Sequence, residues 1–228
     1  RYITAFGEEP RTMSSDKQEN HSHLIWHEEE RTLLLDARIF QVSHSRRRAA
    51  DGRESTYVLV DSADWVNVIA PVHADDGTEM LVMARQYRHG SGSVSLEFPG
   101  GLVDPGEAAQ DAAHRELEEE TGCTASRLVL IGMSNPNPAF MSNTVFTFVA
   151  EGVRLHQDQK LDENERVDVV MVPVDEVVDL MRPDFHVHAI MVSALHWYTR
   201  FRADGLNYAA RLDKWETRRS NAPAGPLH

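Results

Sequence analysis

Short apolar runs separated by polar turns dominate the chain from residue 33 onward. The runs at 33–42 and 56–60 have the composition of strands, and the charged stretch between them, which carries the basic triplet Arg46–Arg48, predicts a solvated turn. The runs at 65–70 and 80–88 flank an Asp-Asp-Gly sequence and predict a β-hairpin. This half of the chain is therefore expected to consist mainly of β-structure.

The second half of the chain mixes strand and helix patterns. Apolar runs predict three strands, at 127–133, 144–150 and 167–174. Longer amphipathic patterns predict three helices, at 107–121, 174–181 and 187–201. Strands mixed with a few flanking helices indicate an α/β or α+β sandwich. The polar ends of the chain, at 1–23 and 206–228, predict flexible tails.

Composition and charge narrow the class of protein and of ligand. The chain has 228 residues, of which 41% are hydrophobic, and a formal net charge of −13. This apolar content is typical of a folded domain, and no uncharged apolar run reaches the roughly 18 residues that a membrane span needs. The acidic balance argues against nucleic acid as a partner, because phosphate backbones are bound by clustered Lys and Arg, and it implies that a divalent metal ion would mediate binding of an anionic ligand. The single cysteine, Cys123, excludes an internal disulfide and is typical of a cytoplasmic protein.

The predicted helix at 107–121 carries three carboxylates on a single face. Glu116, Glu119 and Glu120 are spaced i, i+3 and i+4, and Gly122 is suited to end the helix in the left-handed conformation. Like charges on one face repel each other, and the helix dipole disfavours negative charge near the C-terminal end. A solvated acidic surface is one interpretation. A bound hard cation, Mg²⁺ or Mn²⁺, would remove the repulsion and is the other.

The wider spacing favours the bound cation. Gly101, Glu107, Arg115–Leu117, Glu119–Glu120 and Gly122 fill the charged and glycine positions of the Nudix box, so the chain resembles the Nudix hydrolase family. The resemblance implies the Nudix α/β/α sandwich, here with an additional N-terminal β segment. It also implies hydrolysis of a nucleoside diphosphate linked to another moiety.

The same resemblance assigns roles to individual residues. The metal ligands that it implies are Glu116, Glu120, the backbone carbonyl of Gly100 and, in an assisting role, Glu119. Glu107 and Arg115 would form an ion pair that holds the preceding loop against the helix. Metal binding and catalysis would thus both depend on the box glutamates.

Residues outside the box point to one branch of the family. The sequence RQYR at 85–88, followed by LEFPGG at 96–101, is similar to the ADP-ribose and nucleoside-diphosphate-sugar pyrophosphatases. The resemblance implies that Arg88 contacts a substrate phosphate and that Glu97 lines the site. The substrate would then be a nucleotide sugar.

A proline further along supports the same branch but leaves the substrate open. Pro138 lies 15 residues after Cys123, where ADP-ribose pyrophosphatases usually carry a proline, and is therefore a candidate substrate-binding residue. Ala139 and Asn143 depart from the branch pattern. The alternatives are a Nudix hydrolase of a GDP-sugar, NADH or a dinucleoside polyphosphate, and a non-catalytic Nudix sensor, against which the intact box argues.

The general base is expected on a separate loop. A carboxylate that binds a divalent cation is a poor proton acceptor, because its charge is already engaged. The sequence LDENE at 161–165 is similar to the loop that supplies a catalytic glutamate in this branch. Glu163 is the first candidate and Glu165 the second, whereas a charged surface turn is the alternative interpretation.

The chain divides into four segments by this reading. They are a flexible tail at 1–23, an N-terminal β segment at 24–63, a Nudix hydrolase domain at 64–205 and a C-terminal tail at 206–228. The N-terminal strands would leave an unpaired edge in an isolated subunit, so this segment predicts a homodimer.

Twelve histidines raise the question of a zinc site. His186, His188 and His196 lie on or near the predicted helix at 187–201, but further ligands for zinc are not evident. We therefore expect satisfied or exposed histidines here.

Overall fold

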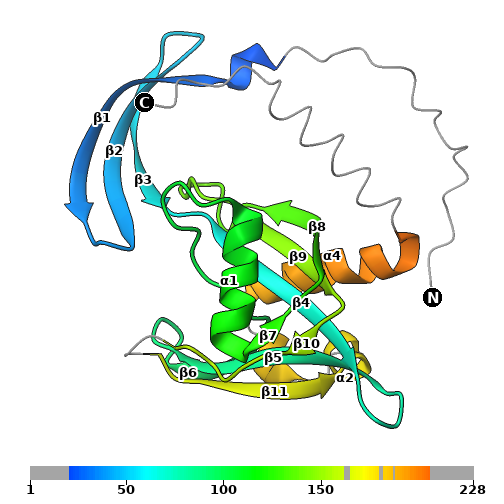
Figure 1. The fold of residues 1–228 in the computed structure, drawn as a ribbon. Coiled ribbons are helices and arrows are strands. Elements are labelled where there is room, and N and C mark those ends of the chain that lie inside the picture. Colours follow the sequence, from blue (N-terminus) through cyan, green and yellow to red (C-terminus); the bar gives the residue numbers. More distant parts are fainter. Residues whose placement is uncertain (1–20, 162–164, 180–181, 187, 206–228) are drawn as a thin grey trace, which may run out of the picture.

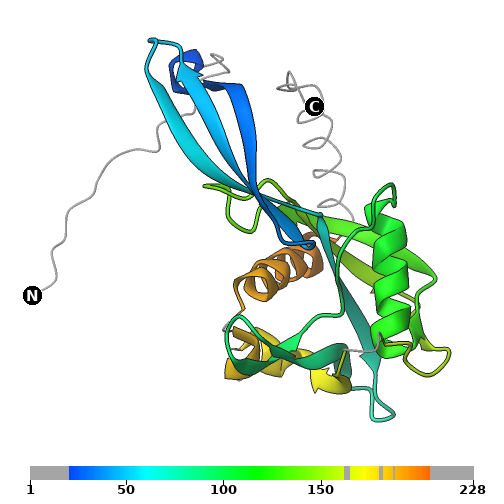
Figure 2. The same cartoon turned by 90° about the vertical axis from the view of Figure 1, so that its left-hand side faces the viewer.

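The computed structural model describes residues 21–161, 165–179, 182–186 and 188–205. They form a three-stranded antiparallel sheet and a larger body, into which the last strand of that sheet leads (Figures 1 and 2). The first sheet consists of β1 (Trp26–Asp36), β2 (Phe40–Ala49) and β3 (Glu54–Ser62). The predicted tail at 1–23 falls almost wholly outside the described residues, and the tail at 206–228 falls outside them entirely.

The first sheet is longer than its apolar pattern predicts. β1 begins earlier than expected, at Trp26, and β2 runs through Arg46–Arg48, so the predicted solvated turn over 43–54 is wrong for most of its length. Arg46 and Arg47 of β2 lie opposite carboxylates of β1, and Arg47 Nη2 is 3.0 Å from Glu28 Oε2. Opposite charges that face each other on neighbouring strands stabilise the pairing here, where a strand usually shows apolar alternation.

The body is built on a six-stranded sheet. Five of its strands follow the order β11-β5-β4-β9-β8, and the sixth, β6, pairs with β5. Its strands are β4 (Trp65–His73), β5 (Glu79–Arg88), β6 (Ser93–Glu97), β8 (Arg127–Ser134), β9 (Val145–Glu151) and β11 (Val167–Pro173). β4 and β5 form the predicted hairpin, with Ala70 opposite Val82. β4 and β9 are parallel, and the other pairs are antiparallel. A small second sheet pairs β7 (Cys123–Thr124) with β10 (Arg154–Leu155).

Helices cover both faces of this sheet (Figures 1 and 2). They are α1 (Ala109–Thr121), α2 (Val174–Val178), α3 (Pro183–His186) and α4 (Ala189–Asp204), and a 3₁₀ turn, η1 (Ser22–Leu24), precedes β1. Side chains of β4 alternate between the two faces, because Val68 joins the core under α1 and Ile69 joins the core under α4. The predicted α/β/α sandwich with an additional N-terminal β segment is confirmed.

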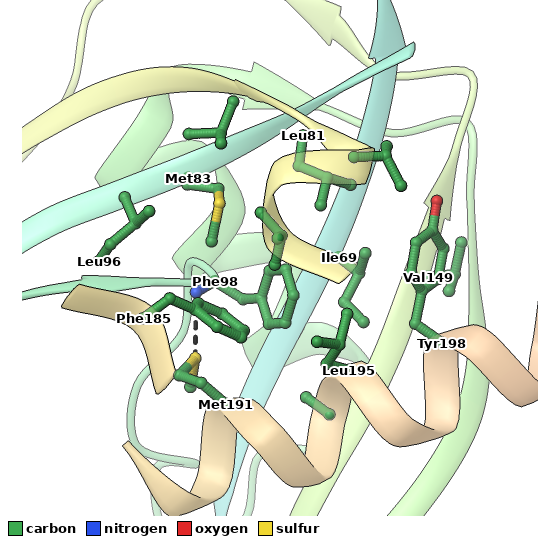
Figure 3. Packing of buried hydrophobic residues seen from close by; sticks show 14 of the residues in the cluster. Ile69, Leu81, Met83, Leu96, Phe98, Val149, Phe185, Met191, Leu195 and Tyr198 are labelled. Atoms are coloured by element: carbon green, nitrogen blue, oxygen red, sulfur yellow. Dashed lines mark hydrogen bonds between the residues drawn. The ribbon is translucent and has the colours of Figure 1, made fainter. Parts of the chain in front are cut away.

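The core under α4 ties the end of β6 to two helices (Figure 3). The ring of Phe98 contacts that of Phe185 on α3 edge-on, with centroids 5.2 Å apart. The backbone N–H of Phe98 donates to Met191 Sδ, in the first turn of α4, at 3.1 Å. The predicted helix at 187–201 is present as α4 over 189–204, while α3 was not expected as a separate turn.

Two expectations from composition can be compared with the fold. Cys123 is free and buried in the core under α1, where it packs as a small apolar side chain. Within the part of the chain that the structure describes, no helix is long and apolar enough to span a bilayer.

Candidate active site

α1 presents the three predicted glutamates beside the loop that precedes it. The helix ends as the sequence predicts, at Gly122, which has a left-handed φ of 68° and donates its N–H to the carbonyl of Glu118 at 2.8 Å. The apolar side of α1 packs on the sheet through Ala112, Ala113 and Leu117. This packing directs Glu116 and Glu120 toward residues 100–101.

Glu120 is the most enclosed of the three carboxylates, with 5% of its surface exposed. Its Oε2 accepts the backbone N–H of Gly100 at 2.9 Å. Burial raises the pKa of Glu120 to about 8, against the effect of this hydrogen bond. The charges of Glu116 and Glu165 raise it further. Solvent no longer stabilises the charged form, so a cation placed here would be strongly favourable.

Two glycines let the loop before α1 approach these carboxylates closely. A Cβ on Gly101 would lie 2.4 Å from Glu116 Oε1, and a Cβ on Gly100 would lie 2.1 Å from the backbone oxygen of Val66. The carbonyls at 99 and 101 accept N–H groups of β4 at 2.8 and 2.9 Å. Because successive peptide groups of an extended segment point in opposite directions, the peptide of Gly100 faces away from β4 and toward α1.

Arg115 binds the outer carboxylates of the box. Its Nε and Nη2 donate to Glu107 Oε1 and Oε2, each at 3.0 Å, and this ion pair confirms the prediction. Its Nη1 is 2.8 Å from Glu116 Oε1 and 3.1 Å from Glu119 Oε2. The guanidinium relieves part of the repulsion on α1. Burial nevertheless leaves the pKa of Glu116 raised, because lost solvation outweighs the effect of Arg115.

A second arginine is anchored on the neighbouring strands. Arg88 Nε donates to Glu97 Oε1 at 2.7 Å, and Arg88 Nη2 contacts Glu97 Oε2. The register of β5 and β6, with Ala84 opposite Glu97, places both side chains on one face of the sheet. Pairing with Glu97 raises the pKa of Arg88, and the charges of Glu120 and Glu165 add to this. The arginine therefore lies within electrostatic reach of the box carboxylates.

The segment before β11 brings one of the two predicted general bases to this site. Glu165 is exposed, and its charge contributes to the raised pKa of both Glu116 and Glu120. It lines a pocket that includes Gln86 and Tyr87 of β5. Glu163 lies outside the described residues, and the choice between the two bases stays a prediction.

Pro138 lies in an exposed part of the connection between β8 and β9. The same connection pairs with the end of β3, where Val60 donates its N–H to the carbonyl of Phe140 at 2.8 Å. Asn143 is buried there, and its Nδ2 donates to the carbonyl of Ala63 at 3.1 Å. The structure thus joins this connection to the N-terminal sheet, and the substrate-binding role of Pro138 stays a prediction.

The family profile described as "NUDIX domain" matches residues 64–195, which include α1, its preceding loop, Arg88 and Glu97. The chain belongs to the Nudix family. Its box is therefore that of a Nudix hydrolase, as the spacing of the glutamates predicts.

Relatives place this Nudix protein within the family. It is 36% identical over 160 residues to the ADP compounds hydrolase NudE of Escherichia coli, covering 70% of this chain and 83% of that protein. It is 33% identical over 132 residues to an ADP-ribose pyrophosphatase of Bacillus subtilis, covering 58% and 69%. A crystal structure of an ADP compounds hydrolase superposes with a TM-score of 0.66 at 28% identity, covering 79% of this chain and 96% of that one. The predicted branch of the Nudix family is confirmed.

The Nudix box can be tested for its fit to a metal ion. As the side chains stand, no three His, Cys, Asp or Glu residues within the described ranges are gathered as a metal site. Glu116 and Glu119 are instead turned toward Arg115. The donor set still fits a hard divalent cation, because two enclosed carboxylates with raised pKa values lie against the glycines that precede α1, Glu120 at Gly100 and Glu116 at Gly101. Binding would require Glu116 to exchange its contact with Arg115 for the metal.

Sequence reasoning missed contacts that join distant parts of this Nudix domain. Arg88 and Glu97 were each expected at the site, but not as a pair. His188 Nε2 lies 3.8 Å from Glu97 Oε2, which agrees with the expectation of a satisfied histidine, but Glu97 was not foreseen as its partner. Gln159 Nε2 donates to the carbonyls of Glu120 (2.5 Å) and Val167 (3.1 Å), which links the end of α1 to β11. The register of β5 and β6 accounts for the pair of Arg88 with Glu97, whereas no sequence signal indicates the other contacts.

Proposed function

We propose that this Nudix enzyme hydrolyses the diphosphate bond of ADP-ribose or a related nucleoside diphosphate sugar, releasing a nucleoside monophosphate and a sugar phosphate. The names of the relatives support an ADP-containing substrate. The observation that carries the proposal is that Glu120 and Arg88 converge on one site. Glu120 is enclosed and accepts the N–H of Gly100, and its charge raises the pKa of Arg88. The single cysteine supports a cytoplasmic location.

Mg²⁺, or Mn²⁺ in its place, is the proposed cofactor. The residues that would hold it are Glu116, Glu120, the carbonyl of Gly100 and, in an assisting role, Glu119. When bound, such a cation neutralises phosphate charge and lowers the pKa of a bound water. The chain itself supplies the rigid support, because α1 is packed on the sheet and the loop at Gly100 is hydrogen-bonded to β4.

Arg88 is the proposed phosphate-binding residue. Among the residues that the structure describes, Glu97 engages its Nε and Nη2, and the Nη1 edge of the guanidinium is left for a phosphate oxygen. In a chain with a net charge of −13, a fixed local cation is needed to attract an anionic substrate. A guanidinium held this way can also stabilise negative charge that develops during the reaction. Pro138 is a further proposed substrate-binding residue, and Glu97 belongs to the same set through its pairing with Arg88.

The test of this proposal is a hydrolysis screen with the full chain. ADP-ribose, other ADP-sugars, GDP-sugars, NADH and dinucleoside polyphosphates are incubated with and without Mg²⁺, and the products are separated by chromatography. We expect AMP and ribose 5-phosphate from ADP-ribose only with the metal. Preference for another nucleotide would reassign the substrate. Tight nucleotide binding without turnover of any compound would favour a non-catalytic sensor and contradict the proposal.

We also propose that the chain is a homodimer, with residues 24–63 as the dimerisation segment and 64–205 as the catalytic domain. β1 and β3 are the two edges of the first sheet, and β1 exposes Leu33 and Leu35 by 53% and 54%. Apolar side chains on an open strand edge favour pairing with a second copy. Light scattering at micromolar concentration should therefore give twice the chain mass of 25.7 kDa.

The double variant Leu33→Glu/Leu35→Glu should shift the scattering mass toward the monomer, because charge at the edge opposes pairing. Leu155→Glu is the matched control, since Leu155 is 78% exposed but lies on β10 of the body. A wild-type monomer, or an equal effect of the control, would contradict the dimer.

A further inference from the structure

Glu97 places a buried negative charge at the end of β6. Only 1% of it is exposed, and its two oxygens contact Nε and Nη2 of Arg88. A carboxylate this deeply buried is stable in its charged form only when it is paired. The Arg88 side chain, in contrast, is 43% exposed. The pair is therefore anchored at its carboxylate end and open at its guanidinium end.

A second side chain reaches the same carboxylate. His188 Nε2 lies 3.8 Å from Glu97 Oε2, the oxygen that also contacts Arg88 Nη2. His188 is the residue that precedes α4, but its side chain makes no capping hydrogen bond to the helix. Its ring is therefore directed to Glu97 rather than used to begin the helix.

Core packing fixes where His188 stands. Phe185 and Met191 flank it in the chain, both are buried, and both contact Phe98 (Figure 3). Phe98 directly follows Glu97. Close-packed interiors transmit position rigidly, so the histidine and the carboxylate are held against each other by the same core.

We propose that His188 is a positioning residue for the phosphate-binding arginine: together with Arg88 it fixes the orientation of the Glu97 carboxylate, so that the free edge of the guanidinium faces the substrate diphosphate. This inference rests on the proposed function. The terminal torsion of a glutamate is soft, and the His188 ring, 3.8 Å from the same oxygen, limits the space into which the carboxylate can rotate. A fixed Glu97 carboxylate matters here because Glu120 and Glu165 also attract the Arg88 guanidinium and would draw it away from Glu97.

The kinetic test compares His188→Ala and His188→Gln with a matched control, His196→Ala, whose histidine is exposed on the same helix. With ADP-ribose and Mg²⁺, His188→Ala should lower kcat/KM about tenfold, mainly by raising KM, because a displaced guanidinium binds the phosphate charge less well. His188→Gln keeps a polar side chain with an N–H group beside Glu97 and should restore most of the loss. In an Arg88→Ala background, His188→Ala should have no further effect.

A second measurement does not depend on activity. The side-chain Nε–H signal of Arg88, assigned by NMR with Arg88→Lys, should shift in His188→Ala and stay unchanged in His196→Ala. Unchanged kcat/KM, an undiminished effect in the Arg88→Ala background, or an unchanged Arg88 signal would overturn the inference. If the wild type hydrolyses no nucleotide sugar, the proposed function fails, and the NMR comparison alone decides whether His188 positions Arg88. His188→Leu serves in both measurements if the alanine variant does not fold.

Discussion

Glu120→Gln should lower kcat by about 10² or more in Mg²⁺, comparable to the loss of a key electrostatic stabiliser. The glutamine keeps the shape of the side chain, and its amide oxygen can still accept the N–H of Gly100. What it removes is the negative charge at the most enclosed position of the box. Steady-state kinetics with ADP-ribose and a metal titration measure the loss of turnover and of metal affinity together.

The same variant should fold normally. In metal-free protein, the native state keeps a proton on Glu120 between pH 4.5, the ordinary pKa of a glutamate, and the raised pKa of about 8, a range in which the unfolded state has released it. The contribution of this group to the free energy of unfolding therefore falls as pH rises through that range. Glutamine does not titrate, so metal-free Glu120→Gln should unfold at or above the wild-type temperature at pH 8. Circular dichroism on heating measures this.

Glu118→Gln is the control for this prediction. Glu118 is on the same helix but contacts Gln157 and Lys160, outside the box cluster. Its loss should leave kcat nearly unchanged. Wild-type turnover of Glu120→Gln in Mg²⁺, or an equal loss of kcat in Glu120→Gln and Glu118→Gln, would contradict the assignment of the box as the metal site.

Glu163→Gln should lower kcat by about 10² while KM and Mg²⁺ affinity stay nearly unchanged, as expected for loss of a general base. The reason is that the box glutamates bind the metal, and metal-binding carboxylates are poor proton acceptors, so a separate carboxylate has to act as the base. Glu165 is the second candidate, and its charge already acts on Glu116 and Glu120. Glu165→Gln is therefore measured in parallel, by steady-state kinetics and metal titration.

Glu151→Gln is the matched control, because Glu151 pairs with Arg127 at the end of β9. A loss of kcat confined to one of the two loop variants identifies the base. If both loop variants turn over like the wild type, the base lies elsewhere, and Glu119 becomes the leading candidate. An increase in KM without a change in kcat would instead assign the loop to substrate binding.

Local patterns were sufficient for much of the body. The β4–β5 hairpin, α1 and its end at Gly122 follow from alternation, turn residues and helical spacing over a few neighbouring positions. The ion pair of Glu107 with Arg115 could be predicted because both residues belong to one short motif. Where a strand is stabilised by charges, as β2 is through Arg47 and Glu28, an apolar pattern cannot show it.

The sequence by itself determined the family, the carboxylate face of α1 and the residues gathered around it, because these depend on spacing along one helix and its preceding loop. Only the tertiary structure decided that Glu97 pairs with Arg88, that Gly101 makes room for Glu116, and that His188 stands beside Glu97. These contacts depend on strand register and on core packing between elements far apart in the chain. Such contacts are set by how the side chains of two packed elements fill the space between them, and the sequence of neither element specifies this alone.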